Sequence, residues 1–280
     1  MIKAIATDLD GTLFYPKRKL RLLKSDNTRF LKSVISEGKK VILVTGRTGH
    51  VSSKVAKRIK SNDLHIIGCN GALIIDKGEV IDETPIEINK AKELCQLLDK
   101  NPKVKSILVF TNKHNLVVDD SHLGLFIALI GRVVMKLQGV YNEPYISGKD
   151  KLYKILDEKD IKVYKIMPWF GLGENSDEIA RLASIEYKES VGDCFEIAWS
   201  DSAVEIVAKG VDKAKGLNFI LSKYGIKNDE VLVAGDSGND LPLFENFEHS
   251  FVMSHAPEEV KSKAKHVIET VADLKEYCKE

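Results

Sequence analysis

Two carboxylates, Asp8 and Asp10, follow an apolar run at the start of the chain and precede a glycine, Gly11. If the extended backbone continues, side chains two residues apart leave the same face, so these carboxylates lie close together. Like charges at that spacing need a cation or a proton between them. Gly11 allows a tight turn whose backbone N–H groups can approach an anion. A pair of acids, a metal ion and free amides together indicate phosphate chemistry.

This stretch has two other interpretations. A calcium loop also contains Asp-x-Asp-Gly, but it needs a third acid before its glycine and a glutamate at its end. Positions 13 to 20 instead supply Leu, Phe, Tyr, Pro, Lys and Arg, which excludes the calcium loop. A plain acidic turn after a strand remains open on this stretch alone.

Two further apolar runs, at 41–44 and 231–234, also end in polar residues, and a lysine pair begins a predicted helix before the second run. Because the carboxyl ends of parallel strands face the same edge of a sheet, these polar residues can converge in space. They are Thr45, Gly46, Arg47, Lys213, Lys215, Asp236, Asn239 and Asp240.

Taken one at a time, these residues have ordinary structural explanations. A lone lysine such as Lys213 usually lies in solvent, Arg47 could be a surface arginine, and Thr45 suits the end of a strand. The segment Gly-Asp-Ser-Gly-Asn-Asp at 235–240 is rich in turn formers. Taken together, at the ends of successive predicted strands, they favour one shared site.

The alternation of strands, loops and helices predicts a doubly wound parallel α/β sheet over residues 1–83 and 200–280. A mixed pattern over residues 84–199 predicts an inserted α+β domain. The core is expected to contain a helix that starts at Ser25 or Asp26 and stops at Gly38, a basic helix over 49–60, and a hairpin through Lys77-Gly78. In the insert we expect helices at 89–99, 123–137 and 174–184, and strands at 104–111, 115–119, 161–166 and 194–199.

The composition narrows the class of protein. The 280 residues are 44% hydrophobic and 30% charged with a net charge of +1, and contain no long basic run, so nothing favours nucleic acid as a partner. The four cysteines form no C-x-x-C pair, and no signal sequence is recognisable. The most apolar helical segment, Leu123–Leu137, is too short to span a bilayer comfortably. We therefore expect a cytoplasmic protein with no membrane partner, as a monomer or homodimer.

Four segments, in this order, resemble the motifs of the haloacid dehalogenase-like superfamily, and within it the Cof-type phosphatases with a large cap. They are Asp8-Leu9-Asp10-Gly11-Thr12-Leu13, Thr45-Gly46-Arg47, Lys213-Ala214-Lys215-Gly216-Leu217 and Gly235-Asp236-Ser237-Gly238-Asn239-Asp240. Asn70-Gly71-Ala72 is similar to the turn that precedes the cap. The chain departs from the family at Ser254-His255-Ala256, where relatives often carry Gly-Asn before Ala.

The resemblance implies a Mg²⁺-dependent phosphatase for a small phosphorylated metabolite such as a sugar phosphate. It implies that Asp8 is a nucleophile that forms an aspartyl-phosphate and that Asp10 is the general acid and base. Asp8, the carbonyl of Asp10, and Asp236 would hold the metal, and Asp240 would either orient a metal-bound water or pair with the lysine. For that lysine, Lys213 fits the motif better than Lys215. The groups expected to contact phosphate or substrate are Gly11, Thr45, Gly46, Arg47, Asn70, Lys213 and Asn239.

Two other functions stay open. A phosphosugar mutase would use the same aspartyl-phosphate and return the phosphoryl group to its substrate, but its cap would need several convergent cationic groups. The lysines and arginines of residues 84–199 are scattered instead. A non-catalytic sensor of phosphorylated metabolites would have no need of the complete set of Asp8, Asp10, Lys213 and Asp236.

Overall fold

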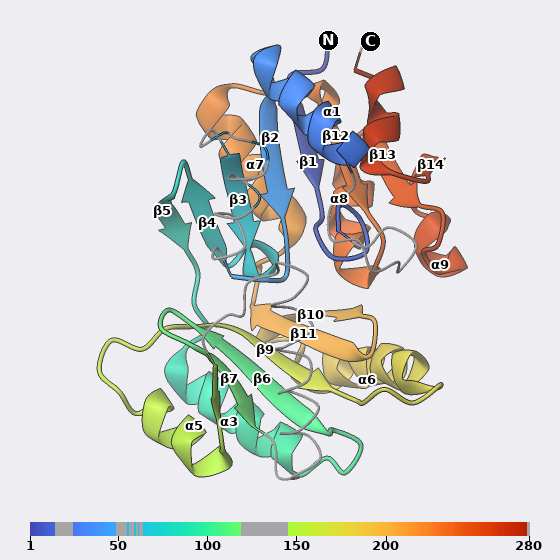
Figure 1. The fold of residues 1–280 in the computed structure, drawn as a ribbon. Helices are drawn as coiled ribbons and strands as arrows, with labels where there is room; N and C mark the ends of the chain where they lie inside the picture. Colours follow the sequence, from blue (N-terminus) through green and yellow to red (C-terminus); the bar gives the residue numbers. More distant parts are fainter. Residues whose placement is uncertain are drawn as a thin grey trace. The chain divides into compact units, whose positions relative to one another are not determined.

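The computed structural model of this chain describes residues 1–14, 25–48, 55, 59, 61, 64–118 and 145–278. The chain divides into two compact units (Figure 1). The first consists of Met1–Glu83 and Asp212–Glu280, and the second of Thr84–Val211. The helix expected at 123–137 and most of the one expected at 49–60 lie outside the described residues. No helix in the described ranges is long and apolar enough to cross a lipid bilayer.

The first unit is built on an eight-stranded sheet with the strand order β14-β13-β12-β1-β2-β3-β4-β5. Every neighbouring pair from β14 to β3 is parallel, and the hairpin β4–β5 adds two antiparallel strands at one edge. The doubly wound parallel sheet expected from the sequence is thereby confirmed. The strands are β1 (Ala4–Thr7), β2 (Lys40–Val44), β3 (Leu64–Gly68), β4 (Leu73–Asp76), β5 (Glu79–Glu83), β12 (Val231–Gly235), β13 (His249–Met253) and β14 (His266–Ile268).

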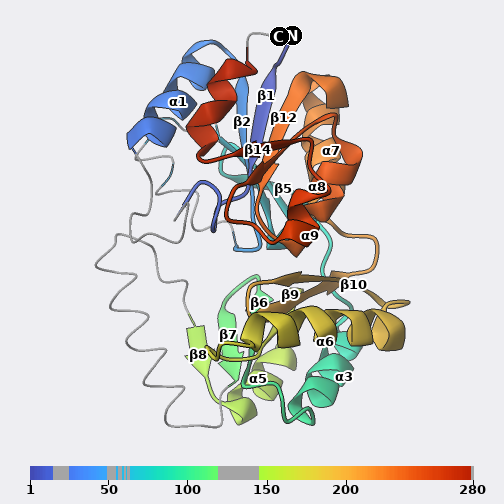
Figure 2. The same ribbon diagram turned by 90° about the vertical axis from the view of Figure 1, so that its right-hand side faces the viewer.

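Helices cover both faces of this sheet, as its apolar central strands require. Figure 2 shows α1 (Ser25–Ser36) on one face and α7 (Lys213–Tyr224) with α8 (Leu241–Asn246) on the other. The buried face of α1 contains the apolar side chains of Phe30, Leu31 and Val34. The shorter helices are the 3-10 turns η3 (Cys69–Gly71), η4 (Asn228–Glu230), η5 (Gly238–Asp240) and η6 (Val271–Glu276), and α9 (Glu258–Lys261).

The second unit has its own six-stranded sheet with the order β10-β11-β9-β6-β7-β8. Among the described residues of this unit, three helices lie along one face of the sheet and bury a separate apolar cluster against it (Figure 2). This arrangement is the α+β architecture expected for the insert. Its elements are α3 (Ile88–Asp99), β6 (Ser106–Thr111), β7 (Asn115–Val118), β8 (Tyr145–Ser147), α5 (Lys149–Leu156), β9 (Val163–Trp169), α6 (Ser176–Val191), β10 (Phe195–Ser200) and β11 (Ala203–Ala208).

The strand β11 corrects one expected boundary. The sequence places residues 200–280 in the α/β core, but β11 pairs antiparallel with β10 and β9 in the sheet of the second unit. Ile206 of β11 lies opposite Ile197 and Ile166, and all three side chains are buried. A short apolar run reports that a strand is buried and does not identify the sheet that receives it. The first unit resumes only at Asp212.

Candidate active site

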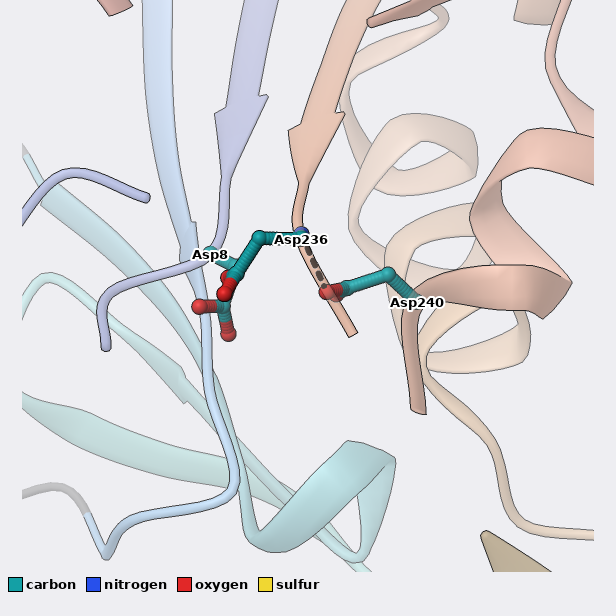
Figure 3. Close-up of side chains that lie close together, drawn as sticks. All are labelled: Asp8, Asp236 and Asp240. Atoms are coloured by element: carbon teal, nitrogen blue, oxygen red, sulfur yellow. Dashed lines mark hydrogen bonds between the residues drawn. The ribbon is translucent and has the colours of Figure 1, made fainter. Parts of the chain in front are cut away.

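Three carboxylates come together beyond the carboxyl ends of β1 and β12. Asp8 follows β1, and its N–H donates to the carbonyl of Ala234 on the parallel neighbour β12 at 2.8 Å. Asp236 follows β12, and Asp240 ends the turn η5. Each offers one carboxylate oxygen, and these oxygens lie within 4.8 Å of one another. Figure 3 shows the carboxylates of Asp8 and Asp236 side by side, with Asp240 reaching back to the backbone of Asp236.

The ammonium group of Lys213 completes this cluster. Its Nζ donates to Asp8 Oδ1 at 2.7 Å, to Asn239 Oδ1 at 2.8 Å and to Asp240 Oδ1 at 2.6 Å. The Lys213 side chain is fully buried, whereas Lys215, two residues further along α7, is exposed. Of the two lysines that the sequence left as candidates, the structure brings Lys213 to the carboxylates.

A close approach between α7 and the end of β3 sets the position of Lys213. At Gly216, in the first turn of α7, a Cβ atom would lie 2.6 Å from Ile67 Cγ2 and 3.1 Å from the Cα of Gly71. A larger residue at Gly216 would push the helix away from the sheet. Asp212 caps the N-terminus of this helix, and its side chain accepts a hydrogen bond from the N–H of Lys215 at 2.8 Å.

The electrostatics of the cluster favour an additional cation. Burial raises the pKa of the Asp8 carboxyl well above its ordinary value, the carboxylates of Asp240 and Asp236 add to this rise, and Lys213 opposes it. Burial by itself would lower the pKa of Lys213, but the carboxylates of Asp240 and Asp8 raise it by more than burial lowers it. The net pKa lies above the ordinary value, so the ammonium group stays charged. The cluster contains three carboxylates and the ammonium group of Lys213, which contacts two of them, Asp8 and Asp240; both of these are buried, whereas Asp236 is partly buried.

Asp240 is held on both of its oxygens. Oδ1 accepts the hydrogen bond from Lys213, and Oδ2 accepts the backbone N–H groups of Asp236 at 2.9 Å and Ser237 at 3.1 Å. A Cβ atom at Gly235 would lie 2.3 Å from the Asp240 carboxyl carbon, so this turn requires a glycine there. The sequence left two contacts open for Asp240, a metal-bound water or the lysine. The structure shows the ion pair with Lys213.

The carboxylate of Asp10 points to a different partner, Arg47. The guanidinium Nε donates to Asp10 Oδ2 at 2.5 Å and Nη2 donates to Oδ1 at 2.6 Å. Both side chains remain accessible, with exposed fractions of 41% for Asp10 and 22% for Arg47. The sequence assigned Arg47 to the substrate, and the pairing with Asp10 was not expected. No spacing rule connects two residues 37 positions apart.

The remaining expected contacts lie around the ends of β2 and β3. Thr45 is buried, its Oγ1 accepts the N–H of Arg47 at 3.1 Å, and its carbonyl accepts the N–H of Asn70 at 3.0 Å. Gly46 forms the bend between Thr45 and Arg47. Asn239 Oδ1 accepts from Lys213 and from Ser237 Oγ at 2.9 Å. Thr45 and Asn239 are therefore fixed in orientation by hydrogen bonds.

Gly11 is required by its contact with Asp236. Its φ is +86°, and a Cβ atom there would lie 2.1 Å from Asp236 Oδ2. The N–H of Gly11, which the sequence assigned to phosphate, donates to the carbonyl of Phe14 at 2.9 Å. In this structure Gly11 supplies room for the carboxylate of Asp236.

Two residues that the sequence did not place in the site also approach Asp236. Thr12 Oγ1 donates to Asp236 Oδ1 at 2.7 Å, and His255 Nε2 lies 3.5 Å from Asp236 Oδ2. The available signals were the position of Thr12 inside the first motif and the departure of the chain from the family pattern at His255. Neither signal by itself identifies Asp236 as the partner.

The donor set fits a hard divalent cation. Asp8 and Asp236 supply carboxylate oxygens, which such cations prefer, and the cluster carries uncompensated negative charge. Asp240 lies within the same group, but its Oδ2 already accepts two backbone N–H groups and its Oδ1 accepts the ammonium group of Lys213. Asp8 and Asp236 are thus the two carboxylates best placed to bind a metal.

Known proteins resemble this chain over most of its length. The haloacid dehalogenase-like hydrolase family matches residues 5–274. The 5-amino-6-(5-phospho-D-ribitylamino)uracil phosphatase YwtE of Bacillus subtilis is 28% identical over 276 residues, which cover 94% of this chain and 91% of that protein. YbjI of Escherichia coli, also named a 5-amino-6-(5-phospho-D-ribitylamino)uracil phosphatase, is 22% identical over 271 residues, which cover 95% of this chain and 90% of that protein. A solved haloacid dehalogenase-like hydrolase from B. subtilis has a TM-score of 0.81 at 20% identity and covers 99% of both chains. That structure is similar in fold.

Proposed function

This chain belongs to the haloacid dehalogenase-like hydrolases, and we propose that it is a Mg²⁺-dependent phosphohydrolase that cleaves a phosphate monoester of a small metabolite. The observation that carries the proposal is the buried contact of Lys213 with Asp8, beside a second carboxylate from Asp236. The membership confirms the superfamily recognised in the sequence. The relatives named as phosphatases at 28% and 22% identity support the reaction class.

Asp8 is the nucleophile of this proposal. One of its carboxylate oxygens attacks phosphorus, the bond between phosphorus and the metabolite oxygen breaks, and an aspartyl-phosphate forms on Asp8. Lys213 holds Asp8 Oδ1 in place and remains charged, so it also stabilises negative charge on the phosphoryl group. Thr45, which follows β2, and Asn239, in the turn η5, also stabilise negative charge on the phosphoryl group in this proposal.

Asp10 is the general acid and base. It gives a proton to the leaving oxygen of the metabolite, then takes a proton from the water that attacks the aspartyl-phosphate. Inorganic phosphate leaves, and the Asp8 carboxylate is restored. Each oxygen of Asp10 accepts one hydrogen bond from Arg47, which orients the carboxyl group and leaves a second lone pair on each oxygen for substrate or water.

The metal of this proposal is Mg²⁺, held by Asp8, Asp236 and the carbonyl of Asp10. When bound, it neutralises charge on the phosphoryl oxygens and on the attacking carboxylate. The support for this assignment is the set of oxygen donors and the excess of carboxylates over cations in the cluster.

For the substrate, we infer a phosphate monoester on a sugar or sugar-alcohol chain. The two relatives are named for a substrate that carries a phospho-D-ribityl group, which has this chemistry. In this proposal the second unit, Thr84–Val211, is the cap and selects among such compounds.

The test is release of inorganic phosphate from a panel of sugar phosphates, sugar-alcohol phosphates, nucleotides and sugar bisphosphates, with Mg²⁺ and with a chelator. Wild type is compared with Asp8→Asn and with a control, Asp26→Asn, which removes an exposed carboxylate of α1. We expect release that requires metal in wild type and in the control, and none in Asp8→Asn.

Three outcomes would contradict the proposal. Release that persists in Asp8→Asn would exclude the aspartyl-phosphate. Turnover that requires a sugar bisphosphate and transfers phosphate between sugar positions would identify a mutase. Ligand-dependent stabilisation of the fold without any release would identify a sensor.

A further inference from the structure

His255 lies beside Asp236 because of the way the sheet ends. The strands β12 and β13 are parallel neighbours, with Gly235 opposite Val252. Asp236 directly follows β12, and His255 follows β13 in a turn closed by a hydrogen bond from the N–H of Ala256 to the carbonyl of Met253 at 3.0 Å. The imidazole therefore reaches the same edge of the sheet as the carboxylate cluster, and its Nε2 lies 3.5 Å from Asp236 Oδ2.

Both ring nitrogens of His255 are buried. The side chain as a whole is 18% exposed, but neither Nδ1 nor Nε2 is accessible to solvent, and neither has a hydrogen-bond partner among the residues that the structure describes. A buried polar atom without a partner costs about 1–3 kcal/mol. Such atoms are uncommon in folded proteins, and each one calls for an explanation such as a bound ion or water.

The carboxylate of Asp236 is approached from two sides. Thr12 Oγ1 donates to Oδ1 at 2.7 Å, while His255 Nε2 faces Oδ2 at a distance too long for a good hydrogen bond. If the distance between Nε2 and Oδ2 shortened by about half an ångström, the two atoms would form a good hydrogen bond. With both contacts made, Thr12 and His255 would fix the plane of the carboxylate.

We propose that His255 is a positioning residue for Asp236: its Nε2–H donates to Asp236 Oδ2 when a divalent cation binds at Asp8 and Asp236. This inference rests on the metal site of the proposed function. Hydrogen bonds to metal-binding carboxylates set the orientation of the ligand, and removing them typically weakens metal affinity by about 10- to 100-fold. His255 thus contributes to metal affinity without binding the metal itself.

This role predicts opposite effects on the metal-free and metal-bound protein. In the metal-free protein, an apolar residue at position 255 removes two buried nitrogens that lack partners, so stability is unchanged or increases. In the metal-bound protein, the same substitution removes a hydrogen bond to a ligand. A residue that only fills space would lower stability in both forms.

The experiment compares wild type, His255→Leu and His255→Gln, with His249→Leu as the control. His249 lies on β13, the strand that precedes His255, and its Nε2 contacts the carbonyl of Asp229 at 3.1 Å. This control therefore replaces a nearby histidine whose ring contacts a backbone carbonyl and not a carboxylate of the cluster. The Kd for Mg²⁺ is measured by calorimetry, and the midpoint of urea unfolding is measured in the presence of a chelator.

For His255→Leu we expect the Kd for Mg²⁺ to rise by about 10- to 100-fold, with an unfolding midpoint equal to or above that of wild type. His255→Gln keeps an N–H donor of similar reach and should recover most of the affinity. Nitrogen NMR gives a second readout, because the ring signals of His255 should move when Mg²⁺ is added, while those of His249 should not.

A Kd in His255→Leu within twofold of a measurable wild-type value would overturn this inference and leave the metal site of the proposed function intact. Wild type that binds no Mg²⁺ would overturn both. If His255→Leu does not fold, the Kd of His255→Gln and the ring signals of His255 in wild type decide the question, and signals that do not respond to Mg²⁺ would count against the proposal.

Discussion

Lys213 Nζ lies 2.6 Å from Asp240 Oδ1, and neither side chain is exposed to solvent. A buried ion pair of this kind gains little over an apolar pair of the same shape, because taking the two charges out of water is costly. Removing only one of the two partners is strongly destabilising, because the charge that remains is buried without a counter-charge. The cluster is therefore sensitive to any change that removes a single member.

Lys213→Met should lower the free energy of unfolding by about 3–5 kcal/mol, because Asp8 and Asp240 then share a buried site without their cation. Urea denaturation measures the change. Lys215→Met, on the exposed side of the same helix, is the matched control and should stay within about 0.5 kcal/mol of wild type. Equal stability of the two variants would contradict the central position of Lys213.

Gly235→Ala should abolish most of the phosphate release by disturbing Asp240. The added Cβ would lie 2.3 Å from the Asp240 carboxyl carbon, so the side chain that pairs with Lys213 must move. Gly173→Ala is the control, since its Cβ would meet nothing closer than Ser176 Oγ at 3.5 Å among the described residues. Steady-state kinetics of both variants test this, and full activity of Gly235→Ala would show that the turn relaxes.

Asp76 links stability to pH at the edge strand β4. Burial alone would raise the pKa of its carboxyl, but hydrogen bonds from Lys223, Tyr224 and His65 lower it to about 2. A pKa lowered by folding adds stability above the unfolded value near 4, and this stability is lost as pH falls toward 2. Asp76→Asn should therefore cost about 2 kcal/mol at pH 7 and progressively less below pH 4. Urea denaturation at pH 7 and pH 3 checks this, and a cost independent of pH would exclude the linkage.

The second unit contains a buried ion pair of its own. Lys165 Nζ on β9 lies 2.8 Å from Glu205 Oε1 on β11 and 4.4 Å from the centre of the Phe110 ring. Lys165→Met should destabilise the protein by about 3–5 kcal/mol, whereas Lys165→Met combined with Glu205→Leu should recover most of the loss. A double-mutant cycle measures the coupling. Additive losses would mean that the two side chains act independently.

The apolar runs of the sequence were sufficient to identify the doubly wound sheet and the strand ends at Asp8, Thr45 and Asp236. These predictions succeeded because buried parallel strands need continuous apolar residues, and because their carboxyl ends share one edge. The hairpin through Lys77-Gly78 was also predicted, from the two apolar runs that flank this pair, and in the structure both residues adopt the positive φ that such a turn requires.

Pairings between distant segments were decided by the tertiary structure. The sequence favoured Lys213 over Lys215 only through the motif that Lys213 fits, and the contacts of Lys213 with Asp8 and Asp240 come from the structure. The sequence could not pair Asp10 with Arg47, and it assigned β11 to the wrong sheet. Apolar periodicity reports which side of an element is buried, but it carries no information about the element that buries it. Polar partners such as Asp236 and His255 meet only because two strands lie next to each other, and that neighbourhood is set by packing of the whole sheet.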